Sequence, residues 1–345
     1  MSEAKPIIGI TMGDPAGIGP EIASKVMAKQ YVYDICRPFV VGDAAVMSDA
    51  VGITKTGLMI NPIYDVKDAR FEYGTLDIFD LKLVDMTKLK KGEVSAMAGT
   101  AAFRSVEKVI KLAMAKEIDA TVTGPLNKEA MNLAGFHFSG HTEIYAHFTG
   151  TKNYSMMLAC DDFRVVHVST HVSLRQACDL VKKDRVFQVI KLADSACKRI
   201  GIAGPRIGVA GLNPHSGLNS FIGEEEVNEI IPAIGMAKEL GINVEGPMSP
   251  DALYACARDG KYDIVVAMYH DQGHIPLKVE GFSWNEEEKK WNAVRGVNIT
   301  LGLPIIRVSV DHGTAFPEAG KGTANEESLL NSVEYAVKLA SSSNG

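Results

Sequence analysis

Hydrophobic positions along this chain fall into two alternating patterns, which predict strands and helices in turn. Short unbroken apolar runs rich in β-branched residues are typical of strands buried on both faces of a sheet. Several of these runs are separated by segments whose apolar residues recur every three or four positions, as in a helix with one buried face. We expect helices over Val106–Ile118, Asp184–Ile200 and Glu224–Leu240. The predicted strands are Pro6–Thr11, Pro38–Val41, Ala120–Thr123, Arg164–Ser169, Arg206–Ala210, Asp263–Met268 and Ile305–Val310.

Local signals mark the ends of two of these helices. Asp184 is a suitable N-cap for the second helix, and Gly201 follows its end. Pro232 is expected to kink or shorten the third helix, because proline has no N–H to donate. Strands that alternate with helices predict right-handed crossovers and an α/β fold with a mostly parallel sheet. A length of 345 residues allows two domains or one large α/β unit.

The composition narrows the class of protein. With 36 basic and 42 acidic side chains the net charge is −6, and 46% of residues are hydrophobic, as in a soluble protein with a large core. The absence of long basic runs argues against nucleic acid or an anionic membrane as a partner. No apolar stretch is long enough for a signal peptide or a membrane span. Five scattered cysteines without C-x-x-C spacing favour a reducing compartment, so we expect a cytoplasmic protein.

Three histidines follow three of the predicted strands. His171 comes after Arg164–Ser169, His215 after Arg206–Ala210, and His270 after Asp263–Met268. Ligands bind at the carboxyl edge of open parallel sheets, so these side chains could converge there. Three neutral imidazoles suit a divalent metal such as zinc or cobalt. A capping or hydrogen-bonding role for each histidine remains the alternative. The other histidines are interpreted as structural or surface residues (His137, His147, His167) or left undecided (His274).

Other polar clusters also follow predicted strands. Thr123–Lys128 and Ser139–Glu143 combine Gly-Pro or Gly turns with polar helix starts, which could face an anion or could simply be turns. The Gly-rich turn Gly13–Glu21 after the first strand is weak evidence for phosphate binding by itself. Three cations and one amide lie in or near an apolar, Gly-rich region: Lys278, Arg295, Asn298 and Arg307. Cations are costly to bury unpaired, so this set indicates recognition of a phosphate or a carboxylate.

Taken together, these stretches resemble the 4-hydroxythreonine-4-phosphate dehydrogenase family of vitamin B6 synthesis. The resemblance spans almost the whole chain in order. It implies a two-domain α/β fold like that of isocitrate and isopropylmalate dehydrogenases, with mostly parallel sheets and an interdomain cleft. The expected domains are 1–125 plus 305–345, and 126–304, the second carrying the metal ligands and the contacts of a homodimer that completes the active site. The matching segments are Gly13–Glu21, Thr123–Lys128, Ser139–Glu143, Ser169–His171, Gly211–Gly217, Met268–Gly273, Gly296–Pro304 and Ser309–Ala315.

The resemblance also implies roles for individual residues. One divalent ion (zinc, cobalt or magnesium) would be held by His171, His215 and His270. Lys278 and Asp271 are our own candidates for catalytic residues: Lys278 would hold an anionic end of the substrate, and Asp271, beside a metal ligand, would orient the site or accept the proton. Substrate contacts would come from His141, Thr142, Lys278, Asn298 and Arg307, and NAD, or else NADP, would be bound by Asp311, His312, Gly313 and Thr314.

The family's biosynthetic reaction is NAD-dependent oxidation and decarboxylation of 4-phosphooxy-L-threonine to 3-amino-2-oxopropyl phosphate. Two features depart from the biosynthetic pattern: His274-Ile275-Pro276 after Gly273, and about ten extra residues between Phe282 and Arg295, which include the polar stretch Trp284–Trp291. Both resemble catabolic relatives that convert D-threonate or D-erythronate 4-phosphate to dihydroxyacetone phosphate. A phospho-ligand sensor without turnover is a more remote alternative. A zinc hydrolase is disfavoured by the missing H-E-x-x-H motif.

Overall fold

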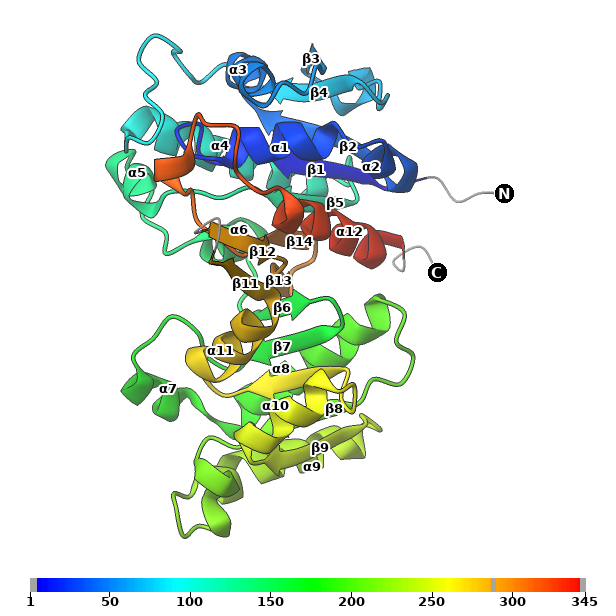
Figure 1. The fold of residues 1–345 in the computed structure, drawn as a ribbon. Coiled ribbons are helices and arrows are strands. Elements are labelled where there is room, and N and C mark those ends of the chain that lie inside the picture. The colour runs from blue at the N-terminus through cyan, green and yellow to red at the C-terminus, as the bar shows by residue number, and fades with distance from the viewer. Residues whose placement is uncertain (1–4, 287–289, 342–345) are drawn as a thin grey trace. The chain divides into compact units, whose positions relative to one another are not determined.

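The computed structural model describes residues 5–286 and 290–341, and the chain divides into two compact units (Figure 1). The first contains residues 1–152 and 303–345, and the second contains residues 153–302. Both are α/β units in which most strands are parallel, as the sequence predicted. No helix within the described residues is long and apolar enough to cross a membrane.

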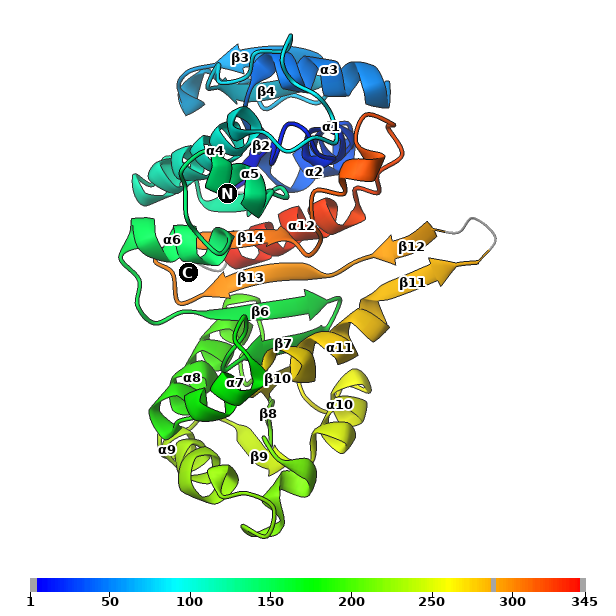
Figure 2. The ribbon, with the colours of Figure 1, turned by 90° about the vertical axis from the view of Figure 1, so that its left-hand side faces the viewer.

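The first unit is built on an entirely parallel sheet with strand order β3-β4-β2-β1-β5-β14. Helices cover both faces of this sheet: α4, α5 and α6 lie on one face, and α1, α2, α3 and α12 on the other (Figure 2). The strands are β1 (Ile7–Thr11), β2 (Arg37–Gly42), β3 (Met59–Ile63), β4 (Thr75–Asp80), β5 (Ala120–Thr123) and β14 (Ile306–Val310). The helices are α1 (Gly19–Met27), α2 (Gln30–Ile35), α3 (Ala44–Thr54), α4 (Ala96–Met114), α5 (Lys128–Leu133), α6 (His141–Thr149) and α12 (Glu327–Ser341).

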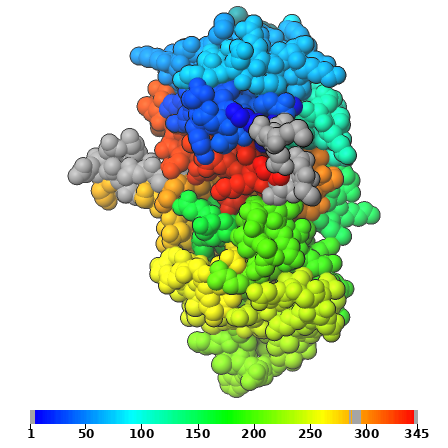
Figure 3. All heavy atoms as spheres, turned by 90° about the vertical axis from the view of Figure 1, so that its right-hand side faces the viewer, coloured from blue at the N-terminus to red at the C-terminus, as the bar shows by residue number. Residues whose placement is uncertain are grey.

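The C-terminal segment completes this first unit. Strand β14 pairs with β5 in parallel, and α12 packs on β14, β5 and β1 beside α1 and α2. The space-filling view shows α12, in red, lying against the blue N-terminal elements of the same unit (Figure 3). The chain therefore returns to the first unit after passing through the second.

The second unit is built on a mixed sheet with strand order β13-β6-β7-β10-β8-β9. Strands β7, β10, β8 and β9 are parallel, whereas β6 runs antiparallel to both β7 and β13. Helices α8 and α9 cover one face, and α10 and α11 cover the other (Figure 2). The strands are β6 (Ser155–Cys160), β7 (Phe163–His167), β8 (Ile207–Ala210), β9 (Val244–Met248), β10 (Ile264–Ala267) and β13 (Val297–Leu301). The helices are α7 (Leu174–Leu180), α8 (Lys183–Arg199), α9 (Ile231–Glu239), α10 (Pro250–Arg258) and α11 (His270–Gly281).

The extra residues after Phe282 form a two-stranded antiparallel ribbon, β11 (Phe282–Asn285) and β12 (Lys290–Val294). Figure 2 shows this ribbon extending from the end of α11. Residues 287–289 of the polar stretch Trp284–Trp291 lie outside the described residues. The insertion thus adds a hairpin to the second unit without interrupting its main sheet.

The boundary between the units lies later in the chain than expected. Residues 126–152, which the sequence assigned to the second domain, fold with the first. Met131 on α5 and Ile144 and Tyr145 on α6 are fully buried in the core of the first unit, together with Val109 and Ile110 of α4. Burial of these apolar side chains holds α5 and α6 on that unit.

All seven predicted strands are present, with ends displaced by no more than two residues. Helix α4 begins at Ala96, ten residues before the predicted start, because the Ser95 side chain caps it by accepting a hydrogen bond from the Ala98 N–H. The predicted N-cap, Asp184, instead lies in the first turn of α8, whose Lys183 N–H donates to the Glu229 carboxylate at 2.7 Å. A residue distant in the sequence, Glu229, therefore accepts a hydrogen bond from the first turn of α8, where a local cap by Asp184 was predicted.

Pro232 shortens the third predicted helix as expected. The preceding turn, Glu226–Ile230, is π-helical, and the α-helix α9 begins only at Ile231. Proline cannot donate to the carbonyl four residues earlier, so the regular hydrogen-bond ladder cannot run through this point.

A pair of helical glycines tests the packing of the first unit. A Cβ added at Gly99 on α4 would lie 2.1 Å from the Ala130 carbonyl oxygen of α5, whereas one added at Gly52 on α3 would meet nothing within 4 Å. We expect Gly99→Ala to lower the free energy of unfolding by about 1–3 kcal/mol through overpacking. Gly52→Ala, the control, should raise it by about 0.5–1 kcal/mol through helix propensity. Urea denaturation measures both, and equal effects of the two changes would contradict this packing.

Candidate functional site

The three strands predicted to carry histidines to one sheet edge are direct neighbours, in the order β7-β10-β8, and they are parallel. His171 follows β7, His270 begins α11 directly after β10, and His215 lies in the turn Pro214–Leu218 after β8. Their carboxyl ends therefore lie along one edge of the second unit's sheet, which is where open parallel sheets bind ligands.

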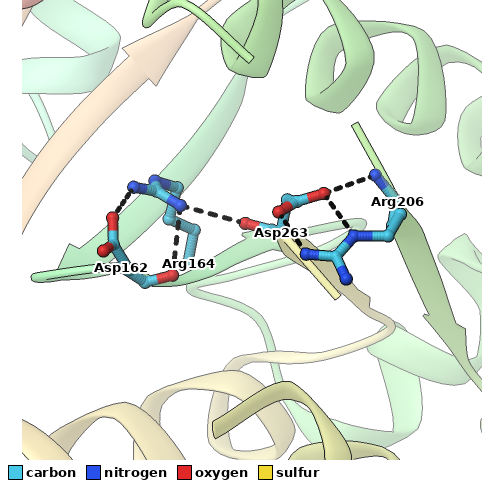
Figure 4. A network of polar contacts seen from close by, with 4 residues as sticks. All are labelled: Asp162, Arg164, Arg206 and Asp263. Carbon is cyan, nitrogen blue, oxygen red and sulfur yellow. Dashed lines mark hydrogen bonds and ion pairs between the residues drawn. The ribbon is translucent and has the colours of Figure 1, made fainter. Parts of the chain in front are cut away.

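A polar network ties together the opposite, amino-terminal ends of the same strands (Figure 4). Asp263, before β10, accepts two hydrogen bonds from the Arg206 guanidinium at 3.0 and 2.8 Å and one from the Arg206 N–H at 2.7 Å. Arg164, on β7, donates to the Asp263 carbonyl at 3.3 Å and to the Asp162 carboxylate at 2.6 Å. Hydrogen bonds from Arg206 hold the pKa of Asp263 below its usual value, so this carboxylate stays charged and fixes the alignment of the strands.

His171 and His270 lie side by side, with ring centroids 5.7 Å apart. His270 Nδ1 is 2.7 Å from the Asp271 Oδ1. The carboxylate can only accept, so Nδ1 carries the proton and the lone pair is placed on Nε2. A carboxylate behind an imidazole is the usual support for a metal-ligating histidine.

His215 lies in a strained loop. His215 and Ser216 have φ values of 51° and 52°, in the left-handed region that L-residues seldom adopt. The buried Glu226 carboxylate holds this loop by accepting from the Asn213 N–H at 2.7 Å and from its side-chain amide at 2.9 Å. His215 is near Asp251, whose pKa is lowered chiefly by the Ser249 hydroxyl and in small part by His215.

The structure brings two of the three predicted metal ligands together. Among the described residues, no group of three His, Cys, Asp or Glu side chains is arranged to hold a metal ion. The shared sheet edge, the His171–His270 pair and the Asp271 support fit metal binding, while a complete three-histidine site stays a prediction.

Two further histidines extend the pair into a row. The His274 ring stacks on that of His270, with centroids 3.6 Å apart and planes 12° from parallel, and the buried His167 ring is 4.7 Å from His274. Burial, followed by the charge of His270, lowers the pKa of His274 to about 4, and burial lowers that of His167 to about 3. Both rings are therefore neutral at pH 7. The i, i+4 spacing of His270 and His274 was the sequence signal for this neighbour, whereas nothing in the sequence placed His167 beneath it.

Lys278 follows His270 and His274 at the same spacing on α11, so the three residues form one stripe of the helix. The Lys278 Nζ is 4.3 Å from the Phe282 ring centroid, and its charge also contributes to the low pKa of His274. Asn298, on β13, donates from its amide to the Met156 Sδ at 2.9 Å. The second unit thus contains Asp271, Lys278 and Asn298 of the predicted catalytic and substrate residues.

The remaining predicted substrate residues belong to the first unit. Arg307 is buried on β14, donates to the Thr123 hydroxyl at 3.2 Å, and has its guanidinium 5.7 Å from the Tyr145 ring centroid. Burial lowers its pKa to about 10, so it is charged at neutral pH. His141 and Thr142 begin α6. Burial, then the positive charges of Arg307 and Lys128, holds the pKa of His141 well below its usual value, so its ring is neutral.

The buried Nε2 of His141 has no hydrogen-bond partner among the described residues. An unpaired buried nitrogen beside a buried guanidinium costs free energy unless a ligand satisfies it. This pair therefore fits recognition of an anionic or polar ligand group.

The predicted cofactor loop, Asp311–Thr314, packs against the Gly-rich turn after β1. The Thr314 carbonyl accepts from the Ile18 N–H at 3.0 Å, and a Cβ on Gly17 would lie 2.8 Å from the same oxygen. A Cβ on Gly313 would meet nothing within 4 Å, so the loop backbone is open to a ligand there. The Asp311–Thr314 loop and the Gly13–Gly19 turn therefore pack directly against each other within the first unit.

Asp14 in this turn is a feature that the sequence did not single out. Its side chain is fully buried, and Oδ1 accepts from the Ala16 N–H at 2.8 Å, while the buried Oδ2 has no hydrogen-bond partner within the described residues. Burial raises the pKa of Asp14 to about 6. The only feature of the sequence that could have drawn attention to Asp14 is its position as an acidic residue within a Gly-rich turn.

The chain is similar to known proteins over almost its whole length. The family model described as pyridoxal phosphate biosynthetic protein PdxA matches residues 34–336. D-threonate 4-phosphate dehydrogenase from Cupriavidus necator is 46% identical over 341 residues, covering 99% of each chain. Crystal structures of 4-hydroxythreonine-4-phosphate dehydrogenases share the fold. The Klebsiella pneumoniae enzyme is 42% identical with a TM-score of 0.84, covering 97% of this chain and 100% of that one. The Burkholderia phymatum enzyme is 43% identical with a TM-score of 0.83, covering 98% and 99%.

The buried Asp14 carboxyl predicts a pH-dependent stability. The pKa is about 6 in the folded state and 3.8 for an unperturbed aspartate, as in the unfolded chain, so the unfavourable contribution of Asp14 is absent below pH 3.8, grows as pH rises, and is complete above pH 6, at about 3 kcal/mol. Asp14→Asn keeps the shape and the acceptor for Ala16 but cannot ionise. We expect its free energy of unfolding, relative to the original chain, to rise by up to about 3 kcal/mol between pH 4 and pH 7.5 in urea denaturation. A difference that does not change with pH would contradict the raised pKa.

Proposed function

Because the chain belongs to the PdxA family of pyridoxal phosphate biosynthetic proteins, we propose that it is an NAD-dependent dehydrogenase that oxidises and decarboxylates a 4-phosphorylated 3-hydroxy acid. The observation that carries this proposal is full-length similarity, at 42–46% identity, to dehydrogenases named for two such acids. Those acids share a carboxylate, a C3 hydroxyl and a C4 phosphate, and they differ in the group on C2.

The first candidate substrate is D-threonate 4-phosphate, supported by the 46% identical relative from Cupriavidus necator. Oxidation at C3 gives a β-keto acid, and loss of C1 as carbon dioxide leaves dihydroxyacetone phosphate. D-erythronate 4-phosphate, which differs in stereochemistry, would give the same product. The second candidate is 4-phosphooxy-L-threonine, which would give 3-amino-2-oxopropyl phosphate and carbon dioxide; the names of the crystallised relatives support it.

We propose that His171, His215 and His270 hold one divalent ion, which can be zinc, cobalt or magnesium. When bound, the ion would act as a Lewis acid that makes the substrate hydroxyl more acidic and stabilises negative charge developing on oxygen. Asp271 keeps the Nε2 lone pair of His270 available by accepting the Nδ1 proton. The strained turn at His215 and Ser216, held by Glu226, would keep the third imidazole in place.

The chain's own polar groups would handle protons and charge. Asp271 would either orient the site through His270 or accept the proton of the C3 hydroxyl. Lys278 would anchor an anionic end of the substrate and supply a proton to C2, which receives the electron pair of the broken C1–C2 bond. The other substrate contacts would be made by His141, Thr142, Asn298 and Arg307, with the fork of Arg307 suited to a phosphate or carboxylate.

NAD, when bound, would supply the hydride acceptor for C3. Asp311, His312, Gly313 and Thr314 are the proposed binding loop, supported by the open space at Gly313 and by the contact between Thr314 and the Gly13–Gly19 turn. NADP is the alternative coenzyme for the same loop.

We propose a homodimer whose contacts come from the second unit. Several large apolar side chains on that unit are exposed, among them Phe221 at 84% and Leu174 at 62%. Such residues are costly to leave in water and are typical of subunit interfaces. We also assign the protein to the cytoplasm, since all five cysteines are free thiols and three of them are buried.

A substrate panel tests the function directly. The purified chain, treated with a chelator and then supplied with one divalent metal, is mixed with NAD and each 4-phosphorylated acid. We expect NADH absorbance and equimolar carbon dioxide with D-threonate 4-phosphate, and slower turnover with 4-phosphooxy-L-threonine. Binding without turnover would indicate a sensor, and turnover without NAD would indicate a hydrolase. Either result would overturn the proposed function, and full activity without added metal would remove the three-histidine site.

Replacing Arg307 by lysine tests the anion-binding role in the first unit. Lysine keeps the charge but loses the forked pair of donors. We expect KM for the phosphorylated acid to rise about 5- to 150-fold, from a lost charged hydrogen bond of about 1–3 kcal/mol. Arg104→Lys, at an exposed arginine of the same unit, is the control and should leave KM unchanged. Steady-state kinetics supply the numbers, thermal melts check folding, and an unaltered KM in a folded Arg307→Lys variant would rule out this role.

A further inference from the structure

One side chain joins the ends of two strands that lead to proposed metal ligands. Gln272, in the first turn of α11, is buried. Its Oε1 accepts a hydrogen bond from the Met268 N–H at 2.7 Å, and its Nε2 donates to the Gly211 carbonyl at 2.8 Å. Met268 is the first residue after β10, and Gly211 is the first residue after β8. The amide therefore links these two strands just beyond the point where they end.

The Gln272 amide acts where the sheet's own pairing stops. Strands β8 and β10 are parallel, and the last partners in their register are Val209 and Val266. Beyond that pair, Gln272 bonds to the Met268 N–H and to the Gly211 carbonyl, and polar backbone groups of buried residues such as these need partners. Glutamine suits the position because one amide carries both a donor and an acceptor.

Gly211 in turn contacts the strained turn that carries His215. A Cβ on Gly211 would lie 3.0 Å from the Ser216 Cα and 3.0 Å from its Oγ, so this backbone packs directly against the turn. At the other end of the link, Gln272 is two residues after His270 on α11. A shift of the β8 end relative to the β10 end would therefore change the separation of His215 and His270.

We infer that Gln272 is a positioning residue of the proposed metal site, because its amide sets the separation of the His215 turn from the His171–His270 pair. Both ends of the amide bond to the backbone, so Gln272 would act through the strand ends and not by contact with the metal. Supporting residues around metal ligands typically change metal affinity by about 10- to 100-fold. The inference rests on the proposed function and identifies the residue that brings the third imidazole into place.

A separate hydrogen bond joins the strand ends that lead to the other two imidazoles. The Ser169 hydroxyl donates to the Met268 carbonyl at 2.9 Å and so connects the ends of β7 and β10. Loss of the Gln272 amide leaves this hydrogen bond in place. We therefore expect Gln272 to affect metal affinity only while His215 is present.

A cycle of variants in the full chain tests this dependence. Gln272→Met keeps the length of the side chain, but it has no donor for Gly211 and offers only a weak acceptor. We expect it to weaken Co²⁺ binding about 10- to 100-fold, measured by titration of the metal-free chain and by the visible absorption of the bound ion. In the His215→Ala background the same change should weaken binding by no more than about 2-fold, since the third imidazole is already absent.

Two further variants control for the chemistry of the change and for folding. Gln30→Met makes the same change at an exposed glutamine of α2, and should leave cobalt affinity unchanged. Gln272→Leu removes the amide with a different side chain and should behave as Gln272→Met does. Circular dichroism checks that each form is folded before titration.

The outcomes separate the inference from the proposed function. An equal loss of affinity with and without His215 would indicate general structural support, and an unchanged affinity in folded Gln272 variants would show no effect; either result overturns the inference. An original chain that binds no Co²⁺ would overturn both the inference and the three-histidine site. If the original chain reduces no NAD but its cobalt affinity depends on Gln272 and His215 as expected, the proposed function fails and the inference stands.

Discussion

Arg206 and Arg164 both bond to Asp263 at the amino-terminal ends of β7, β8 and β10, and this network aligns the three strands that precede His171, His215 and His270. In a parallel sheet, fixing the register at one end of the strands fixes which residues emerge at the other end. Here the residues that emerge are His171, His215 and His270. A one-residue slip would turn alternate side chains to the opposite face and separate His171 from His270. The ion pairs therefore matter less for their own free energy than for the register that they select.

The two units concentrate polar groups in different ways. In the second unit, imidazoles pack on one another, and burial is the main reason that His167 and His274 are neutral at pH 7. In the first unit, single polar groups are buried with incomplete hydrogen bonding, as at Asp14 and the Nε2 of His141. Groups of this kind lower stability unless a ligand satisfies them, and they are concentrated where function is expected.

Sequence reasoning worked best where the pattern was local and strong. The strands were located to within two residues, and Pro232 limited its helix as its chemistry requires. The prediction was wrong where contacts with residues distant in the sequence, not local sequence signals, decide the structure. Glu229, not Asp184, accepts from the first turn of α8, and burial of Tyr145 and Ile144 assigns α6 to the first unit. The resemblance to a dehydrogenase family supplied the candidate site, but His167 and Asp14 could be found only from the structure.

The sequence by itself determined the α/β class, the strands and the family, because buried apolar runs, helical periodicity and ordered motifs are properties of neighbouring residues. The tertiary structure decided which polar groups meet, which tautomers His270 and His274 adopt, and which side chains are buried without partners. The physical reason is that hydrogen bonds and pKa shifts depend on distances of a few ångströms between residues far apart in the chain, and only strand order and packing set those distances.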